Sequence, residues 1–418
     1  MTAPIEHAAL GFTHGEGIRL VRADGARFID AASGTFNVPL GYDNEAVVAP
    51  VLDQLARVSH LGSSFSRTES ARLVERLVAL APGGMTRGWL RDLTGSTANE
   101  CAVRIAQKAT QKSGVLSLFL SHHGQTLFTT AISGNAFRKE SFPVATADVS
   151  LKVPAPYCHR CFYGATYPSC GLMCVERIHD FLEFGGNGRT ACMIVEPILG
   201  NGGNIVPPPG YFEALKRVCD AHDILLVADE VQTGIGRTGH MFACDALGFE
   251  PAMVTLAKGL GGIGIPVAAV LMEARLDVLA PYEHSYTSGA NPIALAAANA
   301  TLDVLADGRL LGEVRENGRL LGALLAPLAE RHACVGDVRG LGYMWGVEIE
   351  TPDGAPDPDR TNAILAEAER RRLIVRSSRY GRGNVVKVRP PLVATPDDLV
   401  EIVDTLSAAI AATGEAAR

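Results

Sequence analysis

Two residues that could share one cofactor follow consecutive apolar segments of the sequence. Asp229 ends the run Ile224-Leu-Leu-Val-Ala-Asp229, and Lys258 comes directly after the run Ala252-Met-Val-Thr-Leu-Ala257. If both runs are buried strands, a carboxylate and an amine lie at neighbouring sheet ends, where open α/β sheets bind ligands. An amine can hold an aldehyde as a Schiff base, and an acid can keep a pyridine nitrogen protonated. The pair therefore indicates pyridoxal phosphate, with Lys258 and Asp229 as catalytic residues.

Each of these residues also has a simpler interpretation. Asp229 could be paired with a nearby arginine such as Arg237, because a buried carboxylate needs a cationic partner. Lys258 could be a surface lysine just beyond a strand end. It is, however, the only lysine that directly follows a predicted apolar strand. Burial there would lower its pKa and supply the free amine that Schiff-base exchange and proton transfer need.

A candidate phosphate site precedes a predicted helix that runs to about Lys112. Thr97 and Glu100 have the spacing of a capping box, and Gly95 lets backbone amides approach a ligand closely. Free amides at a helix start, with the hydroxyls of Ser96 and Thr97, form an anion site that suits a phosphate. An ordinary capped helix would have the same residues.

A glycine run after Asp229 matches the dinucleotide-binding pattern G-x-G-x-x-G. It reads Gly234-Ile-Gly236-Arg-Thr-Gly239. A dinucleotide loop should open a helix directly after the first strand of a βαβ unit. Here Glu-Val-Gln-Thr intervenes after Asp229, and another turn follows soon after the run. A nicotinamide-dependent oxidoreductase is therefore the disfavoured alternative.

Predicted strands and helices alternate between residues 88 and 272. Several of the strands are continuous apolar runs, as expected when both faces of a parallel sheet are covered. The helices between them include Tyr211–His222, whose apolar residues form one stripe. The alternation predicts an α/β fold with a mainly parallel sheet. The predicted strands are Trp89–Leu93, Val115–Leu120, Cys192–Glu196, Ile224–Asp229, Met253–Leu256 and Val267–Met272.

The two ends of the chain are predicted to form a smaller α+β lobe. We expect residues 1–60 to be its N-terminal part, 61–304 to be the large cofactor-binding domain, and 305–418 to be the C-terminal part. The elements predicted outside the large sheet are a hairpin in 17–31 with Asp24-Gly25 as a two-residue turn, helices in 44–58, 68–80, Thr361–Arg372 and Thr395–Thr413, strands Gly342–Glu350 and Asn384–Val388, and a surface loop in 353–359.

The composition is that of an ordinary globular enzyme, with 47% hydrophobic and 20% charged residues among 418. A formal net charge of −7 and the lack of a Lys/Arg cluster argue against nucleic acid as a partner. The N-terminus lacks the pattern of a signal peptide, and no apolar run approaches the ~20 residues that span a bilayer. We therefore expect a cytoplasmic protein with no membrane partner and nine mostly reduced cysteines.

Four of the cysteines have a spacing that could hold structural zinc. Cys158, Cys161, Cys170 and Cys174 form the pattern C-x2-C-x8-C-x3-C. Cysteine is also a small apolar packing residue, and the surrounding segment is rich in aromatic residues. Both interpretations remain open, and neither makes a metal part of the chemistry.

Taken together, the motifs resemble the class-III pyridoxal-phosphate aminotransferases of the ornithine and ω-amino acid type, and the resemblance covers nearly the whole chain. Asp229-Glu-Val-Gln with Gly236-Arg-Thr-Gly is similar to the family's D-E-V-Q-x-G-x-G-R-T-G, and Lys258-Gly matches its Schiff-base lysine. Glu196-Pro-Ile-Leu-Gly resembles E-P-[IV]-x-G, and the segment from Thr287 resembles T-[FY]-x-G-N-P. The resemblance implies fold type I, with a seven-stranded, mainly parallel sheet and a smaller lobe built from both termini.

The resemblance also implies roles for individual residues. Asp229 would hold the pyridine nitrogen, Val231 would pack on the ring, and Gln232 would reach the ring hydroxyl. The phosphate would be bound by Gly95, Ser96 and Thr97. Thr287 would complete the phosphate site of the neighbouring subunit, which implies a homodimer with shared sites. His122 stands where the family has an aromatic ring that stacks on the cofactor.

Departures from the family pattern bear on the substrate. Lys387 stands where the family's R-x-x-P-P-L has an arginine that grips a carboxylate, and Asn201 stands where members with a movable arginine often have glutamate. Lysine lacks the bidentate fork that suits a carboxylate. Arg389 should point to the same strand face and could substitute, or Lys387 could do the same work less rigidly. Phe36, in the glycine-bounded loop 34–41, completes the candidate substrate contacts.

These features predict an aminotransferase that works by two half-reactions. It would take the amino group from a donor such as glutamate and pass it to an aldehyde or ketone. The changed carboxylate residues favour one substrate without an α-carboxylate. A general similarity to aminotransferases of aminoglycoside antibiotic biosynthesis points to an amino sugar with a primary amine. The alternatives are an ω-amino acid or diamine aminotransferase, a dialkylglycine-decarboxylase-like enzyme, an aminomutase, and an epimerase.

Overall fold

A seven-stranded sheet forms the centre of the larger lobe in the computed structural model, which describes residues 11–62, 65, 68–140 and 149–414. Its strands are β4 (Met85–Asp92), β5 (Gly114–Leu118), β6 (Ser150–Val153), β7 (Thr190–Val195), β8 (Leu225–Asp229), β9 (Met253–Leu256) and β10 (Ala268–Glu273). They lie in the order β4-β10-β9-β8-β7-β5-β6. β10 is antiparallel to both of its neighbours, and the other neighbouring pairs are parallel. The predicted mainly parallel sheet is confirmed.

The apolar runs of the sequence form the middle strands of this sheet. Every residue of β7, β8 and β9 is buried, because the sheet is covered on both faces there. All six predicted strands are present, although β4 begins at Met85 and not at Trp89. β6 was not predicted. Its sequence Ser-Leu-Lys-Val lacks an apolar run, because it lies at the sheet edge and is only partly buried.

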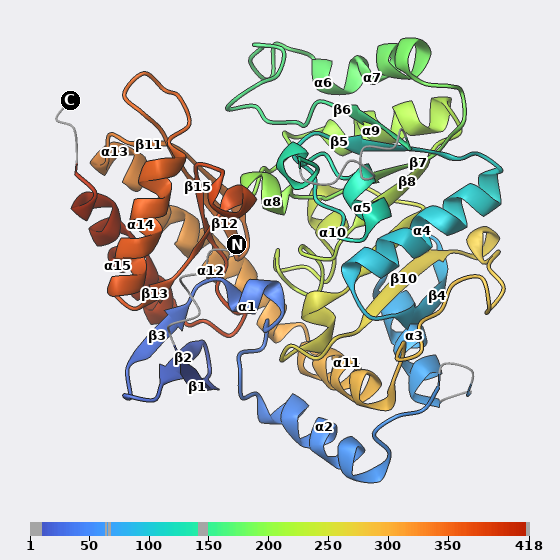
Figure 1. Cartoon of the computed structure of the whole chain (residues 1–418), viewed down its shortest axis with the longest axis horizontal. Helices are drawn as coiled ribbons and strands as arrows, with labels where there is room; N and C mark the ends of the chain where they lie inside the picture. The colour runs from blue at the N-terminus through green and yellow to red at the C-terminus, as the bar shows by residue number, and fades with distance from the viewer. Residues whose placement is uncertain (1–10, 63–64, 66–67, 141–148, 415–418) are drawn as a thin grey trace.

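Helices complete the larger lobe (Figure 1). α9 buries Tyr211, Leu215, Val218 and Cys219, which confirms the predicted apolar stripe. The helices are α2 (Glu45–Arg57), α3 (Thr68–Leu80), α4 (Gly95–Thr110), α5 (Leu127–Ile132), α6 (Met173–Glu176), α7 (Ile178–Asp180), α8 (Gly200–Gly203), α9 (Tyr211–Ala221), α10 (Ala243–Leu247) and α11 (Pro292–Leu305), with helical turns η2 (Ala136–Arg138), η4 (Phe181–Gly185), η5 (Lys258–Gly261) and η6 (Ala274–Leu276).

The smaller lobe joins segments from both ends of the chain. Figure 1 shows the blue N-terminal strands beside the red C-terminal helices. One sheet has the order β1-β2-β3-β13 and the other has the order β11-β12-β15-β14. The elements are β1 (Phe12–Glu16), β2 (Arg19–Arg22), β3 (Arg27–Asp30), α1 (Ser33–Phe36), α12 (Arg309–Leu325), α13 (Leu328–Arg331), β11 (Val335–Leu341), β12 (Met344–Ile349), α14 (Pro358–Arg370), β13 (Leu373–Ile374), β14 (Arg376–Ser377), η7 (Ser378–Gly381), β15 (Val385–Val388) and α15 (Pro396–Ala412). The bounds of the three predicted domains stay a prediction.

Three local predictions were wrong in detail. The hairpin loop between β2 and β3 is longer than two residues, because the backbone N–H of Arg22 bonds to Ala26 across it. The cap of α4 is formed by Thr94 with Thr97 and not by Thr97 with Glu100. The predicted loop 353–359 ends early, because the Asp357 side chain caps α14 and Pro358 opens it.

No helix in the part of the chain that the structure describes is long and apolar enough to cross a membrane.

Candidate active site

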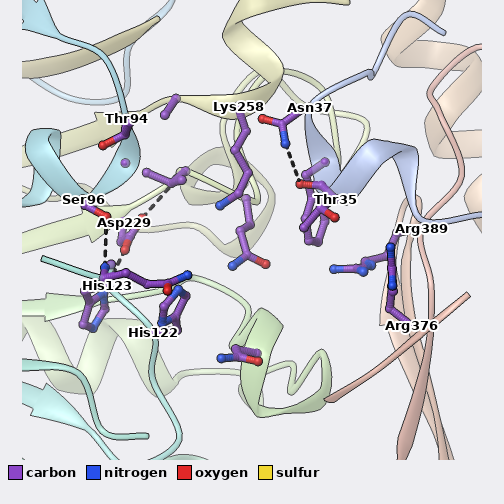
Figure 2. Close-up of a pocket in the computed structure, with 18 of the residues that line it drawn as sticks. Thr35, Asn37, Thr94, Ser96, His122, His123, Asp229, Lys258, Arg376 and Arg389 are labelled. Atoms are coloured by element: carbon purple, nitrogen blue, oxygen red, sulfur yellow. Dashed lines mark hydrogen bonds and ion pairs between the residues drawn. The ribbon is translucent and has the colours of Figure 1, made fainter. Parts of the chain in front are cut away.

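One cavity of about 840 Å³ brings together most of the predicted site residues. Residues that follow β8 and β9 line it together with residues of β14 and β15, so both lobes contribute (Figure 2). Thr97 and Thr287 do not line it. The predicted site residues that do are Phe36, Gly95, Ser96, His122, Asn201, Asp229, Val231, Gln232, Lys258, Lys387 and Arg389.

Asp229 is the last residue of β8 and is buried, with three donors around its carboxylate. Oδ2 accepts hydrogen bonds from Asn99 Nδ2 and His123 Nδ1, both at 2.8 Å, and Oδ1 accepts from the backbone N–H of Val231 at 3.2 Å. Although burial opposes ionisation, the bond from His123 and the charge of Lys258 hold the pKa of Asp229 below its ordinary value. Asp229 is therefore an anion that faces the cavity.

The arginine alternative for Asp229 is not what the structure shows. The Arg237 guanidinium donates to the carbonyl of Pro390 and, at 3.3 Å, to Ser33 Oγ. The glycine run around it forms turns and does not open a helix. The context that a dinucleotide loop requires is missing there.

Lys258 follows β9 after one residue and lies against the cavity (Figure 2). Burial lowers its pKa, although Asp229 and Glu196 oppose that shift. Its backbone has a φ of 43°, in the left-handed region that residues with a side chain avoid. Such strain costs about 1–3 kcal/mol and tends to persist where function requires the conformation. Lys258 is partly buried and lines the cavity, so it is not a surface residue beyond a strand end.

The start of α4 forms a concave surface beside Asp229. A Cβ atom on Gly95 would lie 2.6 Å from Val231 Cγ1, so only glycine allows the helix to begin this close to β8. Ser96 Oγ accepts a hydrogen bond from the backbone N–H of Gln125 at 3.1 Å and faces the cavity. Thr97 Oγ1 is instead engaged with the Thr94 backbone in the cap. Gly95 and Ser96 therefore offer an anion site, and Thr97 lies outside it.

A second group of cations faces the cavity from β14 and β15. Lys387 and Arg389 are buried, and Arg376 joins them in the lining. The Arg389 guanidinium carbon lies 4.2 Å from the centroid of the Phe36 ring. Burial, followed by the charge of Arg389, lowers the pKa of Lys387 well below its ordinary value. Arg389 Nε has no hydrogen-bond partner among the described residues. This end of the cavity can accept an anionic group.

Comparisons with known proteins identify the family. The sequence matches the family model described as Aminotransferase class-III over residues 2–410. The chain belongs to the class-III aminotransferases. It is 34% identical to the leucine/methionine racemase of Thermococcus litoralis over 92% of this chain and 86% of that protein. It is 33% identical to the adenosylmethionine-8-amino-7-oxononanoate aminotransferase of Nitratidesulfovibrio vulgaris over 96% of this chain and 77% of that protein.

A solved structure gives the same answer for the fold. The amine transaminase from an uncultivated Pseudomonas species, in its pyridoxal-phosphate-bound form, matches with a TM-score of 0.91 and 30% identity over 99% of this chain and 98% of that one. The protein is therefore an enzyme of the fold type I class and uses pyridoxal 5′-phosphate. The residues fit this cofactor, because one cavity holds an ionised carboxylate, an amine and a helix start that only glycine permits. When bound, the cofactor supplies an electron sink for the carbon that bears the nitrogen.

Several residues of this aminotransferase site were not predicted from the sequence. His123 and Asn99 hold Asp229, and Thr255 Oγ1 donates to Asn99 Oδ1 at 2.7 Å. Of the pair His122-His123, only His122 was predicted to be a site residue. The signal for Asn99 was its place one turn into the helix that begins at Gly95. No pattern in the sequence points to Thr255.

Glu196 is a further missed residue, although its motif was recognised. It is buried, and its two oxygens accept backbone N–H groups from two different segments. Oε1 accepts from His122 N at 2.8 Å, and Oε2 accepts from Gly200 N at 3.0 Å. Burial raises the pKa of Glu196 to about 7. The carboxylate fixes the spacing between the His122 segment and α8.

The four-cysteine segment is a loop that ends in α6, and it lies outside the cavity. Cys158 is exposed, and Cys161, Cys170 and Cys174 are partly buried, with all four free. Within the described ranges, the groups of three possible ligands whose donor atoms lie within 4.8 Å of one another are Asp92–Cys101–His284 and His159–Glu348–Glu350. Neither group includes these four cysteines. The structural zinc site stays a prediction.

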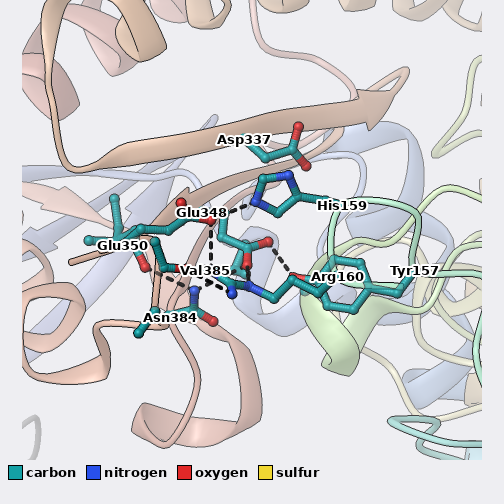
Figure 3. A network of polar contacts seen from close by, with 12 residues as sticks. Tyr157, His159, Arg160, Asp337, Glu348, Glu350, Asn384 and Val385 are labelled. Carbon is teal, nitrogen blue, oxygen red and sulfur yellow. Dashed lines mark hydrogen bonds and ion pairs between the residues drawn. The ribbon is translucent and has the colours of Figure 1, made fainter. Parts of the chain in front are cut away.

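The same loop is joined to the smaller lobe by a polar network (Figure 3). Arg160 Nε lies 2.5 Å from Glu348 Oε1, and Arg160 Nη2 lies 2.7 Å from Glu350 Oε1. Asn384 Nδ2 donates to Glu348 Oε1 at 3.2 Å, immediately before β15. The network therefore supports the strand that carries Lys387 into the cavity.

Proposed function

We propose that this aminotransferase moves amino groups with Lys258 and Asp229 as its catalytic residues. The observation that carries the proposal is that both side chains face one cavity from neighbouring strand ends. Lys258 Nζ would remove a proton from the substrate carbon that bears nitrogen and return a proton during transfer. Asp229 would hold the pyridine nitrogen, with Val231 on the ring face and Gln232 at the ring hydroxyl.

The phosphate would be bound at the start of α4 by Gly95 and Ser96. Free N–H groups at a helix start favour an anion, and the Ser96 hydroxyl adds a donor. Thr97 was predicted to share this role. Its hydroxyl instead bonds to the Thr94 backbone in the helix cap, so Thr97 is not among the proposed phosphate contacts. His122 lines the cavity next to Asp229 and would stack on the ring.

The amino donor is proposed to be an amino acid such as glutamate. Arg389 would receive its carboxylate, with Lys387 beside it, because both are buried basic side chains facing the cavity. An arginine presents a fork of N–H donors that matches a carboxylate. Arg389 would therefore bind the carboxylate in place of the arginine that other members of the family have at the position of Lys387. The acceptor would be an aldehyde or ketone. The amine on the other side of this exchange would be an amino sugar of an aminoglycoside pathway.

The working form is proposed to be a cytoplasmic homodimer with shared sites. Thr287 is exposed and does not line the cavity of its own chain, as expected for a residue that serves the partner's site. A row of exposed apolar side chains on and after α2 would be covered in a dimer. It comprises Leu52, Leu55, Val58, Leu61 and Phe65. The nine free cysteines support a reducing compartment.

A racemase or epimerase is the second candidate. The observation that favours it is the name of the leucine/methionine racemase, which is 34% identical to this chain. Both reactions need the same proton transfer at Lys258, so the site alone does not separate them. Product analysis does. An aminotransferase needs a keto-acid acceptor to turn over, whereas an epimerase inverts its substrate without one.

Replacing Lys258 by alanine tests the main proposal. Turnover should fall by at least about 10⁴-fold, the upper range for a general acid–base group. The visible absorbance of the bound cofactor should shift as the lysine linkage is lost. Lys216→Ala, on the exposed face of α9, is the matched control and should leave both unchanged. Persistent turnover in the Lys258→Ala enzyme would refute the assignment.

A further inference from the structure

Asn201 is a buried amide at the cavity of the proposed enzyme. It lies on α8, is 3% exposed and lines the cavity. Neither Oδ1 nor Nδ2 has a hydrogen-bond partner within the described part of the chain. Most buried polar atoms in folded proteins are paired, because an unpaired donor or acceptor loses water without compensation. An amide left unpaired at both ends in a binding cavity therefore requires an explanation.

His122 presents a second unpaired polar atom at the same cavity. Its Nδ1 is buried and has no partner among the described residues. Burial, together with the charges of Arg138 and Lys258, lowers the pKa of His122 to about 3. The ring is therefore neutral under ordinary conditions. A neutral imidazole has one nitrogen that donates and one that accepts.

Glu196 links the two backbone segments that carry these side chains. One of its oxygens accepts the backbone N–H of His122 at 2.8 Å, and the other accepts the N–H of Gly200, the residue before Asn201, at 3.0 Å. Glu196 is itself 2% exposed, so this link is shielded from water. The amide and the imidazole thus line the same cavity from two segments that Glu196 joins.

We propose that Asn201 and His122 form a subsite for the hydroxyl groups of a polyhydroxylated, sugar-like amine. The inference rests on the proposed function and names the substrate class for it. A hydroxyl both donates and accepts, and two neighbouring hydroxyls can pair with both ends of an amide. The terminal amide turns easily about its last torsion, so it can present either atom to the cavity.

Other substrate groups suit this subsite less well. A carboxylate offers only acceptors and would leave Asn201 Oδ1 unpaired. The buried basic side chains Arg389 and Lys387 already provide for a carboxylate. An apolar amine would leave the amide and the imidazole unpaired. A site built to bond hydroxyls discriminates strongly against analogues that lack them.

Two amines of the same ring size separate these possibilities. One is a pyranose that carries a single aminomethyl group, and the other is aminomethylcyclohexane. Their binding to the holoenzyme is measured by calorimetry, and their amino-group transfer is followed in a single turnover. The variants are Asn201→Leu, which keeps the size but removes both polar atoms, and Asn201→Ala in case the leucine disturbs folding. Asn187→Leu, on an exposed loop, is the control.

The wild-type enzyme should bind the sugar amine at least about 10-fold more tightly than the cyclohexane analogue, as expected for two added hydrogen bonds. Asn201→Leu should remove most of this preference and leave the affinity for the analogue within about 3-fold. An equal loss for both amines, or a wild-type enzyme without the preference, would overturn the subsite. Absence of transfer from any donor would instead refute the proposed function, because binding preference is measured separately.

Discussion

The two halves of the active-site cavity differ in how their polar groups are satisfied. In the half around Asp229, the carboxylate receives three donors from its own chain, and Asn99, which supplies one of them, is fixed by Thr255. In the half around Asn201, the amide has no partner in the described residues. Arg389 Nε and His122 Nδ1, on residues that also line the cavity, likewise have no partner among the described residues.

This difference indicates which work each half does. In the first half, donors of the protein itself hold the Asp229 carboxylate, so its charge is fixed in place before a ligand binds, although His123 Nε2 has no partner among the described residues. Groups left unpaired are completed by what binds, so they select the ligand. Changes in the first half should therefore lower the rate with all substrates. Changes in the second half should alter selectivity.

The largest effect is expected from removing the charge of the Asp229 carboxylate. Asp229→Asn keeps the size of the side chain but removes the charge at the end of β8. The turnover number should fall about 10³-fold, the scale for losing one preorganised electrostatic group. The loss should be the same for every amine donor, as steady-state kinetics with saturating cofactor would show. Asp220→Asn, in an exposed pair with Lys216, is the control. A loss confined to one class of donor would contradict the comparison.

A pH-dependent effect is expected at Glu196, which lies between the halves. Burial raises its pKa to about 7 from an ordinary value of 4.5, so the folded protein keeps a proton that the unfolded chain has lost. Its contribution to the free energy of unfolding is present below the unfolded pKa and is lost as the pH rises through 7. The slope is about 1.4 kcal/mol per pH unit, which totals on the order of 3 kcal/mol.

Glu196→Gln removes this titration. Denaturant unfolding of the wild-type and Glu196→Gln holoenzymes at pH values from 4.5 to above 7 therefore tests the raised pKa of Glu196. The wild-type enzyme should lose stability relative to the variant as the pH rises. The variant also lacks one acceptor for the His122 and Gly200 N–H groups, which adds a constant offset and no slope. A difference between the two proteins that does not change with pH would show that Glu196 has an ordinary pKa.

The fold and the half of the cavity around Asp229 were largely predictable from the sequence. Apolar runs identified β8 and β9, and the residues at their ends identified Asp229 and Lys258. What the sequence did not reveal are contacts between distant segments. His123 and Asn99 reach Asp229 across more than 100 residues of chain, and no periodicity encodes such a bond. β6 was missed because an edge strand needs no apolar run.

The incomplete half was predictable only as a set of unusual residues. Asn201 and Lys387 stood out because they depart from the family pattern. That the Asn201 amide is buried and unpaired depends on packing around α8, which one sequence does not contain. The cap of α4 was misplaced for a related reason, since Thr94 and Thr97 were both available and only geometry selects the pair.

A smaller and more selective effect is expected at Arg389. Arg389→Lys keeps the charge on β15's C-terminal side but removes the planar fork, and the guanidinium no longer lies over Phe36. The KM of an amino-acid donor should rise about 10-fold, as for the loss of one charge-assisted hydrogen bond. The turnover number at saturation should stay within about 3-fold of wild type, because this cation binds ground state and transition state alike.

Amines without a carboxylate provide the internal control for this variant. Their KM should not change, because they leave Arg389 unpaired in both enzymes. The opposite signatures of the two charge changes then define the division of the cavity: Asp229→Asn lowers the turnover number for all donors, and Arg389→Lys raises KM for one class. If Arg389→Lys weakened every amine equally, the Phe36 and Arg389 contact would be a structural part of the wall, and the incomplete half would be confined to Asn201 and His122.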